Sequence, residues 1–185
     1  MGREFELKFA ATKQDHAALQ ERFGNFSPIS METTYYDTPE RAMGARRETL
    51  RRRYENGTAV YALKTYLSDG SHGEWECEAG SLEEALRALS AMGAPDLPPV
   101  ETLGPICGAA FTRSCALLAL EGGTVELALD EGVLTGSGRE LPLREVELEL
   151  KSGADEVLLN FGPAFAAHFG LEEEPLSKFA RAKSL

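Results

Sequence analysis

The chain has 185 residues, of which 43% are hydrophobic and 26% are charged, enough for one substantial core and too few for two ordinary domains. Its formal net charge of -11 argues against nucleic acid as a partner, because nucleic-acid-binding proteins need a cationic face to displace counterions from phosphates. No apolar run approaches the ~18 residues that span a bilayer, and the first residues lack the apolar stretch of a secretory signal. We therefore expect a single domain over residues 1–185 that is cytoplasmic and does not insert into a membrane.

The cysteines and histidines show no pattern of disulfides or zinc ligands. The three cysteines are odd in number and have no CxxC spacing, and the three histidines lie far from them in any zinc-like arrangement. We therefore expect reduced thiols. Basic and acidic residues instead gather in separate segments, such as Arg51-Arg52-Arg53 and Glu145-Val146-Glu147-Leu148-Glu149, and a site that pairs the two groups could bind a polyanion together with its cations.

Alternation and turn signals predict most elements in the first half of the chain. The N-cap pattern at Thr12 predicts a helix that ends at Gly24, and Asn56-Gly57 predicts a β-hairpin between its two flanking strands. The strands expected in this half cover residues 3–10, 31–37, 48–55, 58–66 and 73–78.

The second half of the chain continues the sheet between two helices. The capping-box pattern Ser81-Leu82-Glu83-Glu84 predicts a helix that Gly93 stops, and a final helix over 153–169 should be broken or kinked by Gly162-Pro163. Between them we expect a short helix over 103–109 and strands over 110–120, 124–130 and 143–150. About eight strands joined by turns indicate an α+β domain with an antiparallel sheet and helices packed outside it.

Charged residues recur at every second position in five of the expected strands. Side chains two residues apart point to the same side of a strand, so Glu4, Glu6 and Lys8 share one face and the intervening apolar residues face a core. The other rows are Arg51 and Arg53; Glu74, Glu76 and Glu78; Glu126 and Asp130; and Glu145, Glu147 and Glu149.

These rows have two interpretations. They could be solvated outer faces of an open sheet, since antiparallel sheets commonly have one wet face. Their segregation by sign favours the alternative, in which they line a wet lumen, because stacked carboxylates repel one another unless cations offset them. A divalent metal with a polyphosphate would neutralise both signs, and carboxylate ligands favour hard ions such as Mg²⁺, Mn²⁺ or Ca²⁺. Arg51 and Arg53 could hold phosphate oxygens bidentately, with Lys8 or Lys64 as point charges.

Several motifs resemble one family. Glu4-Phe5-Glu6-Leu7-Lys8 is similar to the ExExK signature of the CYTH, or triphosphate tunnel metalloenzyme, superfamily. Further matching segments follow in the family's order over essentially the whole chain: Tyr35-Tyr36-Asp37-Thr38-Pro39, Leu50-Arg51-Arg52-Arg53, Lys64, Arg113, Glu126 to Asp130, Glu145 to Leu150, and Leu176-Ser177-Lys178 with Arg181. The chain most resembles the CYTH half of bacterial inorganic triphosphatases. This resemblance implies an eight-stranded antiparallel closed β-barrel, with a homodimer as a possible assembly.

The resemblance also implies roles for individual residues. The metal ligands, for Mg²⁺ or Mn²⁺, would be Glu4, Glu6, Asp130, Glu145 and Glu147. The triphosphate would be held by Lys8, Arg51, Arg53, Lys64, Arg113, Lys178 and Arg181. Glu4, Glu6, Lys8, Glu145 and Glu147 would form the catalytic group, with Glu74 or Glu76, Glu126 and Glu149 as possible additional members.

The expected activity is divalent-metal-dependent hydrolysis of inorganic tripolyphosphate or a related organic triphosphate, thiamine triphosphate included. Two alternatives stay open: an adenylate cyclase, as in another branch of the superfamily, and a non-catalytic polyphosphate- or nucleotide-binding module. The aromatic residues, including Tyr35, Tyr36 and Trp75, are interpreted as packing residues rather than platforms for a base. The run Glu172-Glu173-Glu174 is interpreted as solvated.

Overall fold

The computed structural model describes residues 5–66 and 72–185, so Glu4 of the predicted metal-binding pair lies outside the described residues. The strands form one antiparallel sheet in the order β5-β4-β3-β2-β6-β7-β8-β1-β9. The strands are β1 (Glu6–Ala10), β2 (Ser27–Asp37), β3 (Glu48–Glu55), β4 (Thr58–Tyr66), β5 (His72–Glu78), β6 (Gly104–Leu120), β7 (Gly123–Gly136), β8 (Arg139–Gly153) and β9 (Glu172–Glu173). The helices are α1 (Lys13–Phe23), α2 (Ala42–Ala45), α3 (Leu82–Ala91), the 3₁₀ helix η1 (Val100–Thr102), α4 (Asp155–Phe169) and α5 (Lys178–Lys183).

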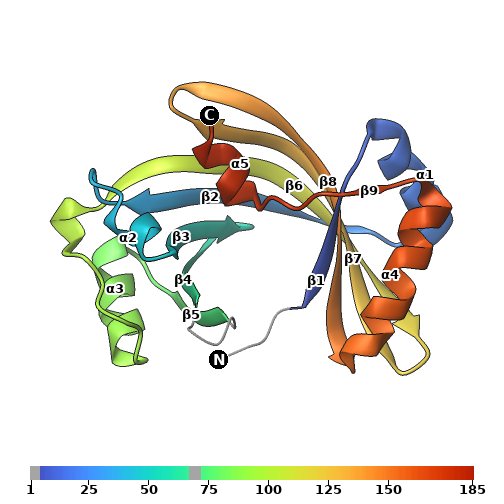
Figure 1. The fold of residues 1–185 in the computed structure, drawn as a ribbon, viewed down its shortest axis with the longest axis horizontal. Coiled ribbons are helices and arrows are strands. Elements are labelled where there is room, and N and C mark those ends of the chain that lie inside the picture. Colours follow the sequence, from blue (N-terminus) through green and yellow to red (C-terminus); the bar gives the residue numbers. More distant parts are fainter. Residues whose placement is uncertain (1–4, 67–71) are drawn as a thin grey trace.

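The sheet is a strongly curved arch. Figure 1 shows β6, β7 and β8 along the top of the arch, with β3, β4 and β5 descending on one side and β1 on the other. In the described part of the chain, the edge strands β5 and β9 do not pair with each other. The α+β class and the antiparallel sheet are therefore confirmed. Within the described segments the sheet has nine strands, where eight were predicted, and its predicted closure into a barrel is not seen. Among the described residues, no helix combines the length and apolar character needed to cross a membrane.

The hairpin and cap predictions for the first half of the chain are confirmed. Asn56 and Gly57 connect β3 to β4 with φ angles of 49° and 93°, the left-handed conformation that the two central residues of a tight type I′ hairpin turn require. Helix α1 begins after Thr12, whose side chain and backbone exchange hydrogen bonds with Asp15, and ends at Gly24.

The short helix predicted over 103–109 is wrong, because β6 begins at Gly104 and pairs with β2 along this whole segment. Pro105 is accommodated at the start of the strand, beside an irregularity in the register at Tyr35 and Tyr36. Strands β7 and β8 also extend beyond their predicted ends, to a turn at Ser137 and Gly138. Pairing with neighbouring strands here outweighs local propensity.

Helix α4 continues through Pro163, so of the predicted break or kink at Gly162-Pro163 the break is wrong and the kink stays a prediction. Gly162 lies against Leu7 of β1, and a side chain at this position would collide with the Leu7 methyl group. The glycine therefore allows α4 to approach the outer face of the sheet closely. There α4 and α1 cover a core that includes Phe9, Leu148 and Phe165.

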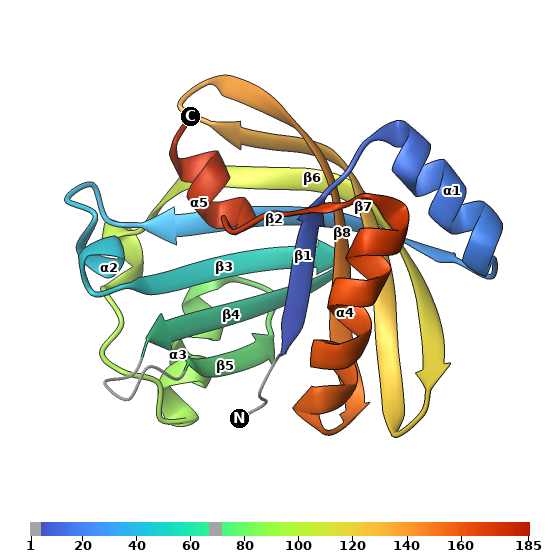
Figure 2. The same cartoon turned by 45° about the vertical axis from the view of Figure 1, so that its right-hand side comes forward.

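The remaining helices lie on both faces of the sheet. Helix α3 covers the outer face of β3, β4 and β5, where Leu50 and Leu63 are fully buried. Helix α5 instead packs on the concave face, where Ala182 joins a cluster with Met31, Tyr35 and Phe111. In Figure 1, α5 lies beneath the curled tip of the β7–β8 hairpin, whereas α3 and α4 lie at the two ends of the sheet, and Figure 2 shows α5 in front of β6 and β2. The prediction that all helices pack outside is therefore wrong for α5.

Candidate functional site

The register of the sheet places the predicted site residues on one face. Directly opposed residues of antiparallel neighbours share a face, and Glu149 lies between Glu6 of β1 and Glu126 of β7. In the next rows Lys8 faces Glu147, and Glu145 faces Asp130, which in turn faces Arg113 of β6. The acidic rows of β1, β7 and β8 therefore meet on the concave face.

The basic residues of β3 and β4 continue this face on the far side of the arch. Ala109, four residues from Arg113 on β6, faces Thr33 of β2, and Thr33 faces Arg53 of β3. Arg51 lies two residues from Arg53 and therefore points to the same face. Lys64 of β4 lies directly opposite Glu74 of β5. The concave surface thus has a carboxylate-rich side and an arginine-rich side, joined through β6 and β2.

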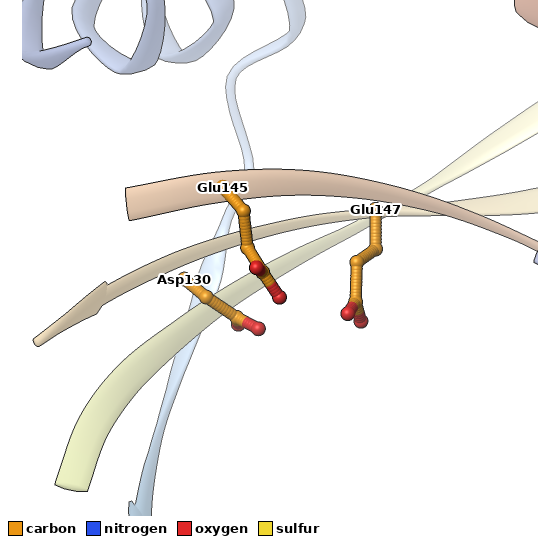
Figure 3. A group of neighbouring side chains, drawn as sticks. All are labelled: Asp130, Glu145 and Glu147. Atoms are coloured by element: carbon orange, nitrogen blue, oxygen red, sulfur yellow. The ribbon is translucent and has the colours of Figure 1, made fainter. Parts of the chain in front are cut away.

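Three carboxylates form the centre of the acidic side. Asp130, Glu145 and Glu147 each place one oxygen within 4.8 Å of the others. Figure 3 shows the three side chains pointing to the same side of β7 and β8. The side chains of Asp130 and Glu145 have no exposed surface, and that of Glu147 is 8% exposed. Buried carboxylates of this density require cationic partners.

Arg113 supplies the first partner. Its Nε and Nη2 atoms donate hydrogen bonds of 2.8 and 2.7 Å to the two oxygens of Asp130, and Nη2 also contacts Glu147. Burial opposes the charge of the guanidinium, but the hydrogen bonds to Asp130 and the negative charge of Glu147 outweigh burial and raise the pKa of Arg113.

Helix α5 supplies the other two partners. The Ser177 hydroxyl accepts a hydrogen bond of 3.1 Å from the Ala180 amide and caps the helix, so Lys178 and Arg181, three residues apart, project from one side. Lys178 Nζ lies 2.7 Å from Asp130 Oδ2 and 2.8 Å from Glu147 Oε1, and it also contacts Glu145. Arg181 contacts Glu145.

The two glutamates respond differently to this environment. Burial favours the neutral form of both carboxyl groups. For Glu145, burial and the nearby negative charge of Glu147 together raise the pKa. For Glu147, the charges of Lys178 and Arg113 outweigh burial and lower the pKa. The site therefore keeps Glu147 ionised at neutral pH.

The arginine-rich side has looser ion pairs. Arg51 and Lys64 both approach Glu74, at 3.6 and 3.4 Å, whereas Glu76 is exposed. Of these two glutamates, Glu74 is the one that contacts the predicted substrate-binding cations. The Nε atoms of Arg53 and Arg181 are buried and have no hydrogen-bond partner among the described residues.

Three other predicted residues lie outside the central cluster. Glu126 and Glu149 share Lys151, at 3.8 and 3.0 Å, and Glu6 is exposed and is not a member of the three-carboxylate group. The structure therefore brings together six of the residues that the resemblance implied: Arg113, Asp130, Glu145, Glu147, Lys178 and Arg181.

Sequence reasoning missed several supporting residues. The ring of Phe111 lies 5.2 Å from Lys178 Nζ, and Glu174 lies 3.5 Å from Arg181, although its run was interpreted as solvated. His16 of α1 is buried, and its Nε2 atom lies 3.1 Å from the backbone carbonyl oxygen of Glu145. Only Glu174 had a signal in the sequence, namely its closeness to Lys178 along the chain.

The donor set fits a hard divalent cation. Carboxylate oxygens are the preferred protein ligands of Mg²⁺ and Mn²⁺, and neither cysteine nor histidine side chains belong to the three-carboxylate group. The concave face of this curved antiparallel sheet therefore combines a carboxylate group able to hold a cation with basic residues able to hold an anion.

A family model described as the CYTH domain matches residues 2–182, and the chain therefore belongs to the CYTH domain family. An inorganic triphosphatase of Haemophilus influenzae is 29% identical over 174 residues, which cover 87% of this chain and 49% of that protein. The chain thus spans about half the length of this relative.

Two solved structures show the same fold. A proposed adenylyl cyclase from Hippeastrum, for which a dominant triphosphatase activity is described, is 21% identical with a TM-score of 0.68, covering 98% of this chain and 95% of that one. The PH1819 protein of Pyrococcus horikoshii is 21% identical with a TM-score of 0.64, covering 96% of this chain and 97% of that one.

Proposed function

We propose that this CYTH domain hydrolyses inorganic tripolyphosphate or a related organic triphosphate with Mg²⁺ or Mn²⁺. The observation that carries the proposal is the shared concave face, on which Asp130, Glu145 and Glu147 lie beside a set of cations that continues across the arch to Arg53. The Haemophilus influenzae relative, named as an inorganic triphosphatase, supports the same activity.

In this proposal the three carboxylates hold the metal ion, which when bound neutralises phosphate charge and polarises the phosphoryl group. Asp130 and Glu147 have oxygens suited to direct ligation, and Arg113 orients both carboxylates through its contacts with them. The concave face of the open sheet serves as the substrate channel.

The cations orient the triphosphate. Arg53 and Arg181 each have a buried Nε atom that no other described residue hydrogen-bonds, and a phosphate oxygen would satisfy it. Arg51 and Lys64 can exchange Glu74 for phosphate, since their ion pairs of 3.6 and 3.4 Å are long. Catalysis would come mainly from positioning and charge neutralisation, as in other phosphoryl transfers.

The experiment that tests this proposal is a panel assay. Phosphate release from tripolyphosphate, thiamine triphosphate and ATP should be measured with Mg²⁺, with Mn²⁺ and with a chelator, alongside cyclic AMP formation from ATP. We expect metal-dependent release from at least one substrate. Cyclic AMP as the main product would establish the cyclase alternative, and binding without turnover of any substrate would establish a non-catalytic module.

A further inference from the structure

The ammonium group of Lys178 occupies the centre of the three-carboxylate group. It lies 2.7 Å from Asp130 and 2.8 Å from Glu147, and it also contacts Glu145. These are the same three residues that offer oxygens within 4.8 Å of one another. A divalent ion held by these carboxylates would therefore need the oxygens that Lys178 already uses.

Charge balance strengthens this competition. Among the described residues, the three carboxylates contact three cations, Arg113, Lys178 and Arg181, so these six groups are formally neutral, and partly exposed Glu174 lies 3.5 Å from Arg181 at their edge. The side chains of these cations are only 12–13% exposed. Adding two positive charges to a neutral and largely buried cluster is unfavourable unless a cation leaves or an anion arrives.

We infer that Lys178 is an internal competitor of the metal ion, and that the triphosphate relieves this competition by taking the Lys178 ammonium as its own partner. The inference rests on the proposed function, because it assigns the regulation of metal binding at the same site. Metal and triphosphate then bind synergistically, and each raises the affinity of the site for the other by the same factor.

The side chain of Lys178 can move while α5 stays docked. Lysine has a flexible stem and three rotatable donors, and the Phe111 ring at 5.2 Å offers a second contact for the ammonium group. The helix itself is held by Ala182, which is fully buried. The backbone of Ala182 packs closely on Gly136 of β7, and a side chain at position 136 would collide with the Ala182 carbonyl oxygen. The competition is therefore between the ion and one side chain, not between the ion and a helix.

The test measures Mn²⁺ binding to the intact chain without turnover, by electron paramagnetic resonance or calorimetry. The Lys178→Met variant keeps most of the side-chain volume and removes the charge. The Lys183→Met variant removes one charge from the same helix, at a position whose ammonium group lies 5.5 Å from the centre of the Phe179 ring. Each protein is titrated with Mn²⁺ alone and with Mn²⁺ plus imidotriphosphate, a non-hydrolysable analogue.

We expect wild type and Lys183→Met to bind Mn²⁺ weakly alone and about tenfold or more tightly with the analogue. Lys178→Met should bind Mn²⁺ alone about tenfold or more tightly than wild type. The analogue should raise the Mn²⁺ affinity of this variant by a smaller factor than it raises that of wild type. Equal or weaker Mn²⁺ binding by folded Lys178→Met, or wild-type Mn²⁺ affinity that the analogue leaves unchanged, would overturn the inference.

Circular dichroism establishes that each variant is folded. If Lys178→Met is unfolded, Lys178→Gln, which also removes the charge, takes its place in the same titrations. The outcomes also separate the two proposals. Tighter Mn²⁺ binding by the Lys178 variant without hydrolysis by wild type contradicts the proposed activity and supports the competition, whereas metal-dependent hydrolysis by wild type with unchanged Mn²⁺ affinity in the Lys178 variant contradicts only the competition.

Discussion

Arg113 and Asp130 face each other across β6 and β7, and one guanidinium donates two hydrogen bonds, of 2.8 and 2.7 Å, to one fully buried carboxylate. Removal of the guanidinium in Arg113→Met leaves Asp130 with one cation fewer. We expect this variant to lose about 3 kcal/mol of unfolding free energy without metal, because a buried carboxylate keeps Lys178 but loses the two hydrogen bonds of its arginine partner. Urea unfolding gives the value.

The matched control for this prediction is Arg144→Met. Arg144 contacts Glu131, whose side chain is 50% exposed, so the loss should be at most about 1 kcal/mol. Similar losses in the two arginine variants would show that the buried pair has no special importance for stability.

The N-cap of α5 connects stability to substrate binding. Ser177→Ala removes the acceptor for the Ala180 amide and should cost about 1 kcal/mol. Because α5 presents Lys178 and Arg181, we also expect a higher KM for tripolyphosphate. Ser81→Ala removes the corresponding cap of α3, which accepts from Glu84 at 3.2 Å, and should lower stability by a similar amount without raising KM. An equal rise in KM for both variants would contradict the assigned role of α5.

The contact between Gly162 and Leu7 predicts a compensating pair of mutations. Gly162→Ala alone places a methyl group against the Leu7 side chain and should destabilise the protein by about 1–3 kcal/mol through overpacking. Leu7→Ala in the same chain makes room, so the double variant should be less destabilised than the sum of the single variants. Additive losses in a double-mutant cycle would show that the two residues do not interact.

His16 gives the stability a dependence on pH. Burial lowers the pKa of this imidazole from 6.5, so the folded state favours the neutral ring, which donates from Nε2 to the Glu145 carbonyl. The stabilisation is complete above about pH 6.5 and is lost as pH falls toward the lower folded pKa, because the unfolded state then binds more protons. Unfolding free energies of wild type should therefore fall more steeply below pH 6.5 than those of His16→Ala. Parallel profiles for the two proteins would contradict this.

Side-chain direction and one hairpin were predictable from the sequence, whereas pairing between strands distant along the chain was not. A strand has a period of two, so parity alone placed Glu145 and Glu147, or Arg51 and Arg53, on a common face once the strands were recognised. The Asn56-Gly57 turn likewise predicted the β3–β4 hairpin, because few other residues adopt the two positive φ angles that it requires.

Long-range features of the site lay beyond sequence reasoning. Lys178 reaches Glu145 across 33 positions of sequence because a six-residue helix docks on the concave face, and a helix so short gives no periodic signal. His16 meets Glu145 from a different element, 129 positions away. Whether the edge strands β5 and β9 meet depends on the curvature of the whole sheet, and local sequence patterns do not encode that curvature.

The most direct measurement of the central claim is the initial rate of phosphate release from tripolyphosphate with Mg²⁺ or Mn²⁺ for wild type, Glu147→Gln and Glu131→Gln. Both variants exchange a carboxylate for an amide, but Glu147 belongs to the buried cluster whereas Glu131 contacts Arg144 on the opposite face of β7. We predict metal-dependent release by wild type and Glu131→Gln, and a loss of about 100-fold or more in Glu147→Gln. Wild-type protein without metal-dependent release, or Glu147→Gln as active as Glu131→Gln, would contradict the account.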